Sequence, residues 1–556
     1  MPVSADPGAG TGRLRVVDYI VHHLARRGIH HLFGVDGANI EDLYDAAHAH
    51  PQVTAIVAKH EFSAAAMADA YSRTAPTLGV VVATSGGGAL NTVPGLGESL
   101  ASRVPVLALI GQAFAADDGL GPFQDTSGAN GTLDAAALFS AVSVFCQRIT
   151  TPRDILTALP EALAAVTSLR GPAVLLLPKD IQQALIDAPA DDDIPAHPQL
   201  PVDLGPIIDL LATTTGPVTI VAGDQVARDD ARAELHHLQA TLDAAIVTEP
   251  DAKDAAPAAL GVAGVMGHPA VSAAIASSAA CLLVGSRMPL MARRGLDATL
   301  AAIPVASLGS APPYLPATHV HTDDLKSALA ALAHALTTRP RTPHHTAPTE
   351  LAPPEHTGPG VRYRDAMADL DAVLPDGTDI AVDAGNIGAA AIHWLPARRD
   401  GRFLVALGMG GMGYSFGAGV GMAFARAGKP GRVVVIAGDG SFYMHGMEIH
   451  TAIQHQLPVT FVLFDNQAHA MCVTREQVFY GGGYSYNRFG PSRLGAGLAA
   501  MFPGLPSTDV CDRAGFVAAL DAALGADGPS VVAVECSADE IPPFTAFLAS
   551  TAKESQ

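Results

Sequence analysis

The segment from Arg432 to Met471 constrains the fold more than any other part of the chain. Residues 432–437 and 459–464 are short apolar runs rich in β-branched side chains, which indicates two buried strands. Residues 446–456, between these runs, favour a helix. A strand–helix–strand unit of this length makes its two strands parallel neighbours, so their carboxyl ends should meet at one edge of a sheet.

Polar residues follow both predicted strands, at the edge where ligands of α/β sheets bind. Gly438, Gly440 and Ser441 allow close approach of the backbone and begin a helix whose free N–H groups suit a diphosphate. Asp439 and Asn466 offer the oxygen ligands that Mg²⁺ accepts beside phosphate and water. A Gly-Asp-Gly turn alone would fit an ordinary strand–turn–helix. Because Asn466 follows the second strand directly, a metal–diphosphate site is the favoured interpretation.

Composition limits the class of protein. The chain has 556 residues, of which 49% are hydrophobic, and a net charge of −21. Its length suggests about three domains of ~150–200 residues. The acidic surface argues against nucleic acid or an anionic membrane as a partner. The cysteines are scattered without CxxC spacing, so we expect neither disulfides nor a zinc ribbon, and a reducing cytoplasm is the expected location; they are Cys146, Cys281, Cys472, Cys511 and Cys536.

Helical and strand patterns alternate along the chain, and the strands are nearly continuous apolar runs. This pattern predicts an α/β fold of three doubly wound parallel-sheet domains. We place the domains at residues 1–188, 202–336 and 361–556. Two polar, proline-rich stretches, 188–201 and 337–360, are the predicted linkers. The first residues lack the apolar core of a signal peptide and are expected to form a frayed leader.

Two motifs together resemble the thiamine-diphosphate-dependent enzymes of the acetolactate synthase, pyruvate decarboxylase and benzoylformate decarboxylase group. Gly438-Asp439-Gly440 with Asn466 is similar to the family's thiamine diphosphate and magnesium motif. HEFSAAAMADAYSR, which begins at His60, is similar to the family's HE-x-x-A-x-x-x-A-x-x-Y-x-R helix. The resemblance covers nearly the whole chain. It implies a pyrimidine-binding first domain, a middle domain, and a third domain that binds the diphosphate and Mg²⁺ through Asp439, Asn466 and the main-chain carbonyl of Ala468.

Glu61 is the predicted catalytic acid–base. By the resemblance, this glutamate exchanges a proton with the aminopyrimidine ring, which makes the cofactor basic enough to generate its own nucleophile. A glutamate in the first turn of a helix can also simply complement the helix dipole.

Further cofactor contacts follow from the resemblance. Gly408, Gly410 and Gly413 have the spacing of a dinucleotide fingerprint, but no acidic residue follows at the expected ~20 positions. In the family this stretch supplies a bulky apolar wedge beneath the cofactor, and Met412 has that position; a core methionine is the alternative. The expected cofactor-binding residues are Glu61, Asn386, Gly410, Met412, Gly438, Asp439, Gly440, Ser441, Asn466, Ala468 and Met471.

The substrate pocket is predicted from smaller matches and departures. Phe123-Gln124-Asp125 resembles the synthases' Phe-Gln-Glu, whose glutamine reaches the reacting centre from the partner subunit. Gln124 is therefore the second catalytic candidate, with a surface glutamine as the alternative. Asp36 stands where the family usually has proline, and His445 where the synthases have asparagine. The candidate pocket comprises Asp36, Ala38, Gly87, Phe123, Gln124, His445 and Met471.

Missing proton donors favour ligation over simple decarboxylation. Pyruvate decarboxylases have an adjacent histidine pair in the region between Gly111 and Cys146, where this chain has none, and Thr84 stands where benzoylformate decarboxylase has histidine. We therefore expect a carboligase that decarboxylates a 2-oxo acid such as pyruvate and joins the acyl carbanion equivalent to a second carbonyl. A decarboxylase that releases an aldehyde and a non-catalytic thiamine-binding homologue remain open.

The resemblance also bears on assembly and on other cofactors. Glu61 of the family reaches a cofactor held by another subunit, which implies a homodimer or homotetramer. The run LLVGSRMPLM lacks the acidic residues that follow the arginine in FAD-binding synthases, so FAD is not expected. The sequence leaves open the donor, the acceptor, the stereochemistry and the pathway.

Overall fold

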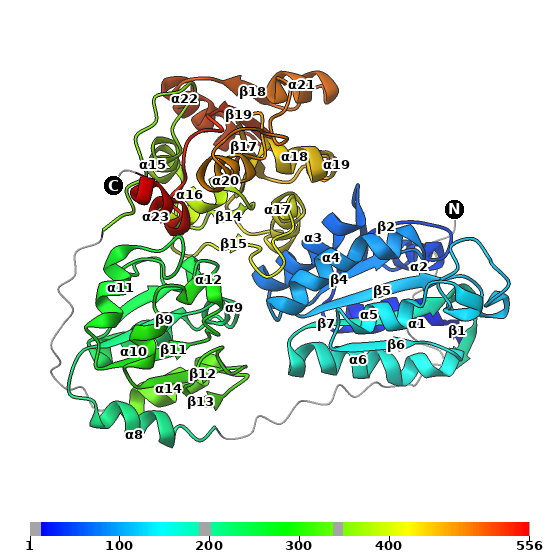
Figure 1. The fold of residues 1–556 in the computed structure, drawn as a ribbon. Coiled ribbons are helices and arrows are strands. Elements are labelled where there is room, and N and C mark those ends of the chain that lie inside the picture. Colours follow the sequence, from blue (N-terminus) through cyan, green and yellow to red (C-terminus); the bar gives the residue numbers. More distant parts are fainter. Residues whose placement is uncertain (1–12, 188–201, 337–348, 555–556) are drawn as a thin grey trace. The chain divides into compact units, whose positions relative to one another are not determined.

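The computed structural model describes residues 13–187, 202–336 and 349–554 (Figure 1). Residues 1–12 of the predicted leader, the first predicted linker and the beginning of the second lie outside these residues, whereas residues 13–15, also expected to be frayed, form a paired strand. Three separate sheets of parallel strands, each accompanied by helices, confirm the predicted α/β class. Within the described residues, no helix combines the length and the apolar character needed to cross a membrane.

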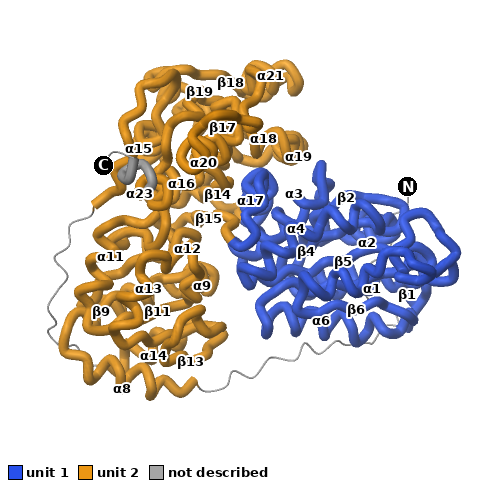
Figure 2. The backbone as a smooth tube through the Cα atoms, viewed as in Figure 1, with its two compact units in different colours: residues 1–198, 408–425 blue, residues 199–407, 426–556 orange. Residues whose placement is uncertain are grey.

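The chain divides into two compact units. Residues 1–198 and 408–425 form the first, and residues 199–407 and 426–556 form the second (Figure 2). The segment 408–425 therefore packs with the first unit although it lies in the predicted third domain. The predicted domain boundaries remain predictions.

The sheet of the first unit has the strand order β3-β2-β4-β5-β7-β6. Its central strands are apolar runs buried along their whole length, as expected where helices cover both faces. A short antiparallel pair, β1 and β8, lies apart from it. The elements are β1 (Arg13–Arg15), α1 (Val16–Arg26), β2 (His31–Val35), α2 (Glu41–Ala49), β3 (Thr54–Val57), α3 (Glu61–Thr74), β4 (Gly79–Ala83), α4 (Gly87–Ala101), β5 (Val106–Gln112), α5 (Ala135–Ser140), β6 (Phe145–Arg148), α6 (Ile155–Leu169), β7 (Pro172–Pro178), α7 (Lys179–Gln183), β8 (Leu185–Asp187) and α17 (Tyr414–Ala425).

The second unit contains two sheets. The first of them has the order β10-β9-β11-β12-β13, with every strand parallel to its neighbours. Its core is formed by the buried faces of these strands and of the helices between them. The elements are α8 (Gly205–Thr213), β9 (Val218–Ala222), α9 (Gln225–Arg228), α10 (Arg232–Leu242), β10 (Ala245–Thr248), α11 (Pro269–Ala276), β11 (Ala280–Val284), α12 (Leu290–Arg293), α13 (Asp297–Ala301), β12 (Val305–Gly309), β13 (Thr318–His321) and α14 (Leu325–Ala335).

The other sheet of the second unit has the order β15-β14-β16-β17-β19-β18. Its elements are α15 (Tyr363–Val373), β14 (Asp379–Val382), α16 (Asn386–Trp394), β15 (Phe403–Val405), β16 (Val433–Gly438), α18 (Asp439–His445), α19 (Glu448–Gln454), β17 (Val459–Asp465), α20 (Ala470–Tyr480), α21 (Leu494–Met501), β18 (Ser507–Val510), α22 (Arg513–Leu524), β19 (Ser530–Glu535) and α23 (Thr545–Glu554).

The predicted strand–helix–strand unit is present, with one correction. β16 and β17 are parallel neighbours, with Gly438 opposite Phe464, as the sequence predicts. The helix predicted at 446–456 corresponds to α19, and a separate short helix, α18, precedes it and begins at Asp439, directly after the strand. The chain leaves α18 at Gly446, where the absence of a side chain leaves room for the ring of Phe442. Apolar periodicity alone did not reveal this break.

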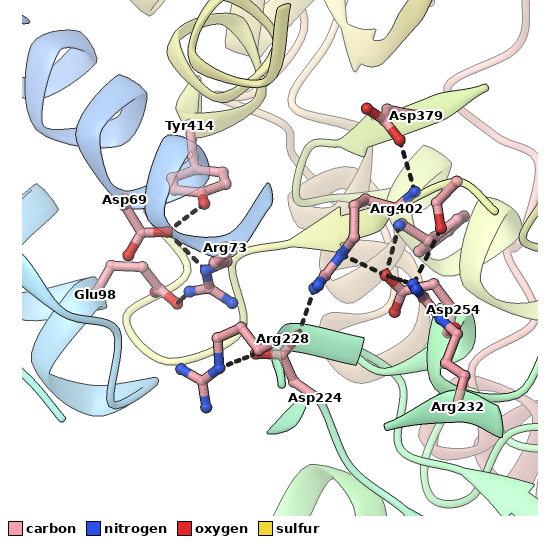
Figure 3. Close-up of polar contacts among 12 residues, drawn as sticks. Asp69, Arg73, Glu98, Asp224, Arg228, Arg232, Asp254, Asp379, Arg402 and Tyr414 are labelled. Atoms are coloured by element: carbon pink, nitrogen blue, oxygen red, sulfur yellow. Dashed lines mark hydrogen bonds and ion pairs between the residues drawn. The ribbon is translucent and has the colours of Figure 1, made fainter. Parts of the chain in front are cut away.

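Buried ion pairs join the two sheets inside the second unit. Arg402, directly before β15, donates to Asp224 Oδ1 at 2.8 Å and lies 2.6 Å from Asp254 Oδ2 (Figure 3). Arg232 reaches the same oxygen of Asp254 at 3.3 Å. Asp254 is fully buried, and its pKa is raised by burial although the arginines oppose that shift. Removing one partner would leave a charge buried without compensation, so these pairs hold the two sheets in one arrangement.

Lys253, the neighbour of Asp254, anchors a helix of the other sheet. Its buried ammonium group donates to the carbonyl oxygens of Ala391 at 3.0 Å and Ile392 at 2.6 Å, and also to that of Leu395. These carbonyls belong to the C-terminal end of α16, where a cation is favourable. The opposite end of α16 begins with Asn386, so Lys253 fixes a helix whose first residue is a candidate ligand contact.

Helices α3 and α17 pack closely in the first unit. Gly417 and Gly421, one turn apart on α17, face the main-chain carbonyls of Ser63 and Met67 on α3. A Cβ atom at either glycine would collide with these carbonyls. The close approach therefore requires glycine at both positions.

Gly421→Ala is expected to lower the free energy of unfolding by about 1–3 kcal/mol, because backbone atoms must move to admit the methyl group. Gly497→Ala on α21 is the matched control, since a Cβ there meets nothing within 4 Å. That variant should be neutral or stabilising by up to about 1 kcal/mol, from helix propensity. Denaturant midpoints of the purified proteins measure both, and equal midpoints for the two variants would refute close packing at α3.

Candidate functional site

Two groups of the predicted site residues are described separately, one in each unit. In the second unit, Asp439 and Asn466 directly follow β16 and β17 at the carboxyl edge of the sheet. Asp439 is fully buried, and its Oδ2 accepts a hydrogen bond from the N–H of Ala468 at 3.2 Å. Oδ1 of Asp439 and Oδ1 of Asn466 are buried without a hydrogen-bond partner among the described residues.

Burial makes the charged form of the Asp439 carboxyl costly. Burial, and to a lesser extent Asp465, raise the pKa of its carboxyl to about 7, although main-chain N–H groups of Gly440, Asn466 and Ala468 oppose the shift. The pKa of Asp465 is itself raised by burial. Two buried carboxyls close together favour the binding of a cation. The two unpartnered oxygens and the carbonyl of Ala468 are a donor set that fits Mg²⁺.

Neighbouring strand ends complete this group. Asn386 is buried at the first position of α16, where its amide nitrogen donates to Thr474 Oγ1 at 3.0 Å and its Oδ1 has no partner among the described residues. Ser441 donates its hydroxyl proton to Asp383 Oδ1 at 2.6 Å, so its main-chain N–H is the group left for an anion. Met471 is half-buried near the start of α20. Sequence reasoning missed Asp383 and Thr474.

The histidines of this region lie in different places. His469 packs its ring against Gly440, where a Cβ atom would collide with the imidazole. The edge of its ring faces Phe489 at 4.7 Å between centroids, and burial lowers its pKa. His445 is the last residue of α18, at the opposite end of that helix from Asp439. The ring of His469 thus lies against the Gly-Asp-Gly turn, and the place of His445 in the substrate pocket stays a prediction.

In the first unit, Glu61 begins α3 and is buried. Its Oε2 accepts a hydrogen bond from Asn91 of α4 at 2.9 Å. Its Oε1 lies 3.0 Å from the point that a Cβ of Gly88 would occupy, so the glycines at the start of α4 leave space for the carboxylate. Asn91, which the sequence reasoning did not assign, is the last residue of the run TSGGGALN at residues 84–91.

The other pocket candidates lie on loops at the carboxyl edge of the first sheet. Asp36 and Ala38 are exposed on the loop after β2, and Gly87 is the first residue of α4. Gln124 is half-buried and lies against the turn before α4. Phe123 is 77% exposed, so its ring is not part of a closed pocket in this unit.

The loop that carries Gly410 and Met412 is bound to the helices of the first unit. Glu98 on α4 accepts hydrogen bonds from the N–H groups of Gly408 at 3.1 Å and Met409 at 2.5 Å. Directly after the loop, Tyr414 donates to Asp69 of α3 at 2.5 Å (Figure 3).

Arg73 neutralises these two carboxylates. Its Nε donates to Asp69 at 2.7 Å, and its guanidinium lies 3.7 Å from Glu98. All three side chains are almost fully buried. The loop of Met412 is therefore held to the helix that begins with Glu61. Acidic residues within otherwise apolar helical runs were the available sequence signal for Asp69 and Glu98.

Comparison with known proteins identifies the chain's family. Residues 14–134 match the N-terminal TPP binding domain of thiamine pyrophosphate enzymes, residues 205–312 the central domain and residues 383–534 the C-terminal TPP binding domain. The chain belongs to the thiamine pyrophosphate enzyme family. The predicted resemblance is thereby confirmed, and the candidate residues of both groups lie in segments that match TPP binding domains.

Individual thiamine pyrophosphate enzymes are similar along most of the chain. The acetolactate synthase isozyme 2 large subunit of Escherichia coli (strain K12) is 28% identical over 539 residues, covering 94% of this chain and 95% of that protein. Sulfoacetaldehyde acetyltransferase of Alcaligenes xylosoxydans xylosoxydans is 25% identical over 516 residues, covering 82% of each. A solved structure from Mycobacterium smegmatis, described as a candidate thiamin diphosphate-dependent enzyme, has the same fold, with a TM-score of 0.80, 20% identity and coverage of 95% and 100%.

Asp439→Asn is expected to stabilise the protein when cofactor and divalent cations are absent. The folded-state pKa of about 7 exceeds the ordinary value of 3.8, so the folded state binds the extra proton between these values. The free energy of unfolding of the natural protein therefore falls as the pH rises through that window. We expect a gain of about 1–3 kcal/mol at about pH 8 and almost none at about pH 4.

Urea midpoints in a chelating buffer measure this effect, with Asp527→Asn as the control because Asp527 is exposed. A midpoint at about pH 8 that is no higher for Asp439→Asn than for the natural protein would contradict a costly buried charge.

Proposed function

We propose that the protein is a thiamine-diphosphate- and Mg²⁺-dependent carboligase. It decarboxylates a 2-oxo acid such as pyruvate and joins the acyl carbanion equivalent to a second carbonyl compound. The observation that carries the proposal is the pair of buried, unpartnered oxygens of Asp439 and Asn466 at adjacent strand ends, in a chain that also holds the buried Glu61. The similarity to acetolactate synthases supports the ligating reaction.

Each group of residues has a task in this reaction. Asp439, Asn466 and the carbonyl of Ala468 bind Mg²⁺ and thereby the diphosphate. Thiamine diphosphate, when bound, supplies a carbon nucleophile for the 2-oxo acid and accepts the electron pair that CO₂ leaves behind. Glu61 moves a proton to and from the aminopyrimidine ring, while Asn91 holds its other oxygen at 2.9 Å. Met412, on the loop held by Glu98, would supply an apolar contact to the cofactor.

The side chains around Gln124 support ligation. Thr84 and Ser85 donate hydrogen bonds to it and Asn39 donates to both of them, and none of these groups gives up a proton near neutral pH. Decarboxylation to an aldehyde requires a proton donor at the carbanion, whereas ligation requires a second carbonyl.

Assembly and location are part of the proposal. Glu61 of one subunit acts on the cofactor held by the third domain of another, in a cytoplasmic homodimer or homotetramer. Neither FAD, nucleic acid nor membrane takes part.

Glu61→Gln and Asp439→Asn should separate catalysis from cofactor binding. The first variant retains the Mg²⁺ and diphosphate ligands, so thiamine diphosphate with Mg²⁺ should still raise its melting temperature, while turnover falls by about 100-fold or more. The second should lose both the thermal shift and turnover. Thermal shift and CO₂ release measure the two effects. Full turnover by Glu61→Gln would refute the proton-transfer assignment, and no thermal shift in the natural protein would favour a non-catalytic homologue without this cofactor.

The products distinguish ligation from decarboxylation. With pyruvate and thiamine diphosphate–Mg²⁺, and with or without an added aldehyde or ketone, we expect mass spectrometry to detect an acyloin or a 2-hydroxy-2-acyl acid. The reason is that Thr84 and Ser85, the side chains that hydrogen-bond Gln124 among the described residues, release no proton near neutral pH. Heat-denatured enzyme is the control, and acetaldehyde as the sole product would establish the decarboxylase alternative.

A further inference from the structure

Two chains of hydrogen bonds run from Asn39 to one oxygen of Gln124. The main-chain N–H of Asn39 donates to Thr84 Oγ1 at 3.3 Å, and the Thr84 hydroxyl donates to Gln124 Oε1 at 3.4 Å. In the second chain, Asn39 Nδ2 donates to Ser85 Oγ at 2.6 Å, and the Ser85 hydroxyl donates to the same oxygen of Gln124 at 3.3 Å. We define Asn39, Thr84 and Ser85 as the Asn39 relay.

The Asn39 relay fixes which end of the Gln124 amide faces inward. A main-chain N–H can only donate, so Thr84 Oγ1 accepts there and its own proton is left for Gln124. Gln124 must meet that proton with its carbonyl oxygen. Its amino group therefore faces away from the relay.

The main chain at Asn39, where the relay begins, is fixed by buried contacts. Gln182 of α7 is fully buried, and its amide nitrogen donates to the carbonyls of Asn39 at 2.8 Å and Leu177 at 2.7 Å. Gly111 lies beneath the Asn39 carbonyl, where a Cβ would collide with it. Asn39 itself is 7% exposed. The loop after β2 is thus a fixed base for the relay.

The backbone of Gln124 is held in an uncommon conformation. Its φ is +61°, in the left-handed region that residues other than glycine seldom occupy. Its Cγ lies 2.8 Å from the point that a Cβ of Gly86 would occupy, so any larger residue at 86 would displace the side chain. Such a conformation persists where its surroundings determine it, and it is typical of binding and catalytic sites.

We propose that the Asn39 relay positions Gln124 as a hydrogen-bond donor to a carbonyl or carboxylate oxygen of the substrate, an inference that rests on the proposed function. Nε2 of Gln124 makes no hydrogen bond to the residues that the structure describes. Next to Gln124, the Thr84 methyl group and Glu61 Oε1 lie 2.9 and 3.0 Å from the Cβ point of Gly88. Thr84, which hydrogen-bonds Gln124, is therefore also a neighbour of the Glu61 carboxylate. Asn39 is a positioning residue, and Gln124 is the substrate contact.

Substitutions of nearly equal size can test this arrangement. In Gln124→Glu the outward donor becomes a carboxylate oxygen, which repels a substrate oxygen. In Asn39→Asp the side chain can only accept, so Ser85 turns its proton away from Gln124. Ser85→Ala removes the same branch without adding charge. Asn130→Asp is the matched control, because Asn130 lies on the same stretch as Gln124 but donates to Gly119 O at 2.7 Å, outside the relay.

Steady-state kinetics with the 2-oxo acid are the first readout. We expect Gln124→Glu to lower kcat/KM by about 10- to 100-fold, because a donor is replaced by a negative charge. Asn39→Asp and Ser85→Ala should lower kcat/KM by about 3- to 10-fold, the loss expected for one neutral hydrogen bond. The double variant Asn39→Asp/Gln124→Glu should match Gln124→Glu alone, because residues that act through one contact are not additive. The thermal shift with thiamine diphosphate–Mg²⁺ should be unchanged in all variants, and Asn130→Asp should behave as the natural protein.

Two kinetic outcomes would overturn the proposal. Natural kcat/KM in Gln124→Glu would show that Gln124 is not a substrate contact, and additive losses in the double variant would show that Asn39 does not act through Gln124.

A readout without turnover keeps the test independent of the proposed function. In cofactor-free protein labelled with ¹⁵N-glutamine, the side-chain amide signals of Gln124 are assigned by their loss in Gln124→Glu. We expect Asn39→Asp and Ser85→Ala to move these signals and Asn130→Asp to leave them in place. Unmoved signals in the first two variants would refute the relay. Moved signals in a protein that turns over no 2-oxo acid would uphold the relay and refute the proposed function.

Discussion

The buried carboxylate of Asp439 is the group around which the candidate site of the second unit is arranged. Burial and a neighbouring acid raise its pKa to about 7, and one of its oxygens lacks a partner among the described residues. Such a group is costly unless a cation accompanies it. The strand order of the sheet places it at the ligand edge. β14, β16 and β17 are neighbours, and they are followed directly by the polar residues Asp383, Asp439 and Asn466. This edge of the sheet lowers the stability of the ligand-free protein, and a bound ligand would offset that loss.

Two buried carboxylates of the first unit differ from that of Asp439. Asp69 and Glu98 are neutralised within the chain by Arg73 and by donors of the loop before α17. They have no need of a ligand and serve to fix position. Lys253 has the same purpose in the second unit, where it holds the far end of α16. A buried carboxylate with an unpartnered oxygen, as in Asp439, therefore indicates a binding group. Buried charges that are paired within the chain, as in Asp69, Glu98 and Lys253, indicate structural support.

Local patterns in the sequence predicted the parallel sheets, the neighbouring strands β16 and β17, and the edge with Asp439 and Asn466. They missed features that depend on contacts between distant segments. The packing of α17 on α3 follows from Gly417 and Gly421, which meet the main-chain carbonyls of Ser63 and Met67 far away in the sequence. Asn39 is another case, because its partners Thr84 and Ser85 lie more than forty positions along the chain. Periodicity carries no information about such partners.

The chemistry of a carboxamide links the proposed reaction to the proposed contact. An amide donates a hydrogen bond to an oxygen but does not release a proton at neutral pH. A group of this kind stabilises charge on a substrate oxygen while leaving a carbanion unprotonated, and so available to a second carbonyl. A histidine at Thr84 would supply the missing proton and favour release of an aldehyde. The threonine does more than remove that donor, because its hydroxyl turns the amide of Gln124 outward. In the proposed reaction, Thr84 thus both leaves the carbanion unprotonated and orients the hydrogen-bond donor of Gln124.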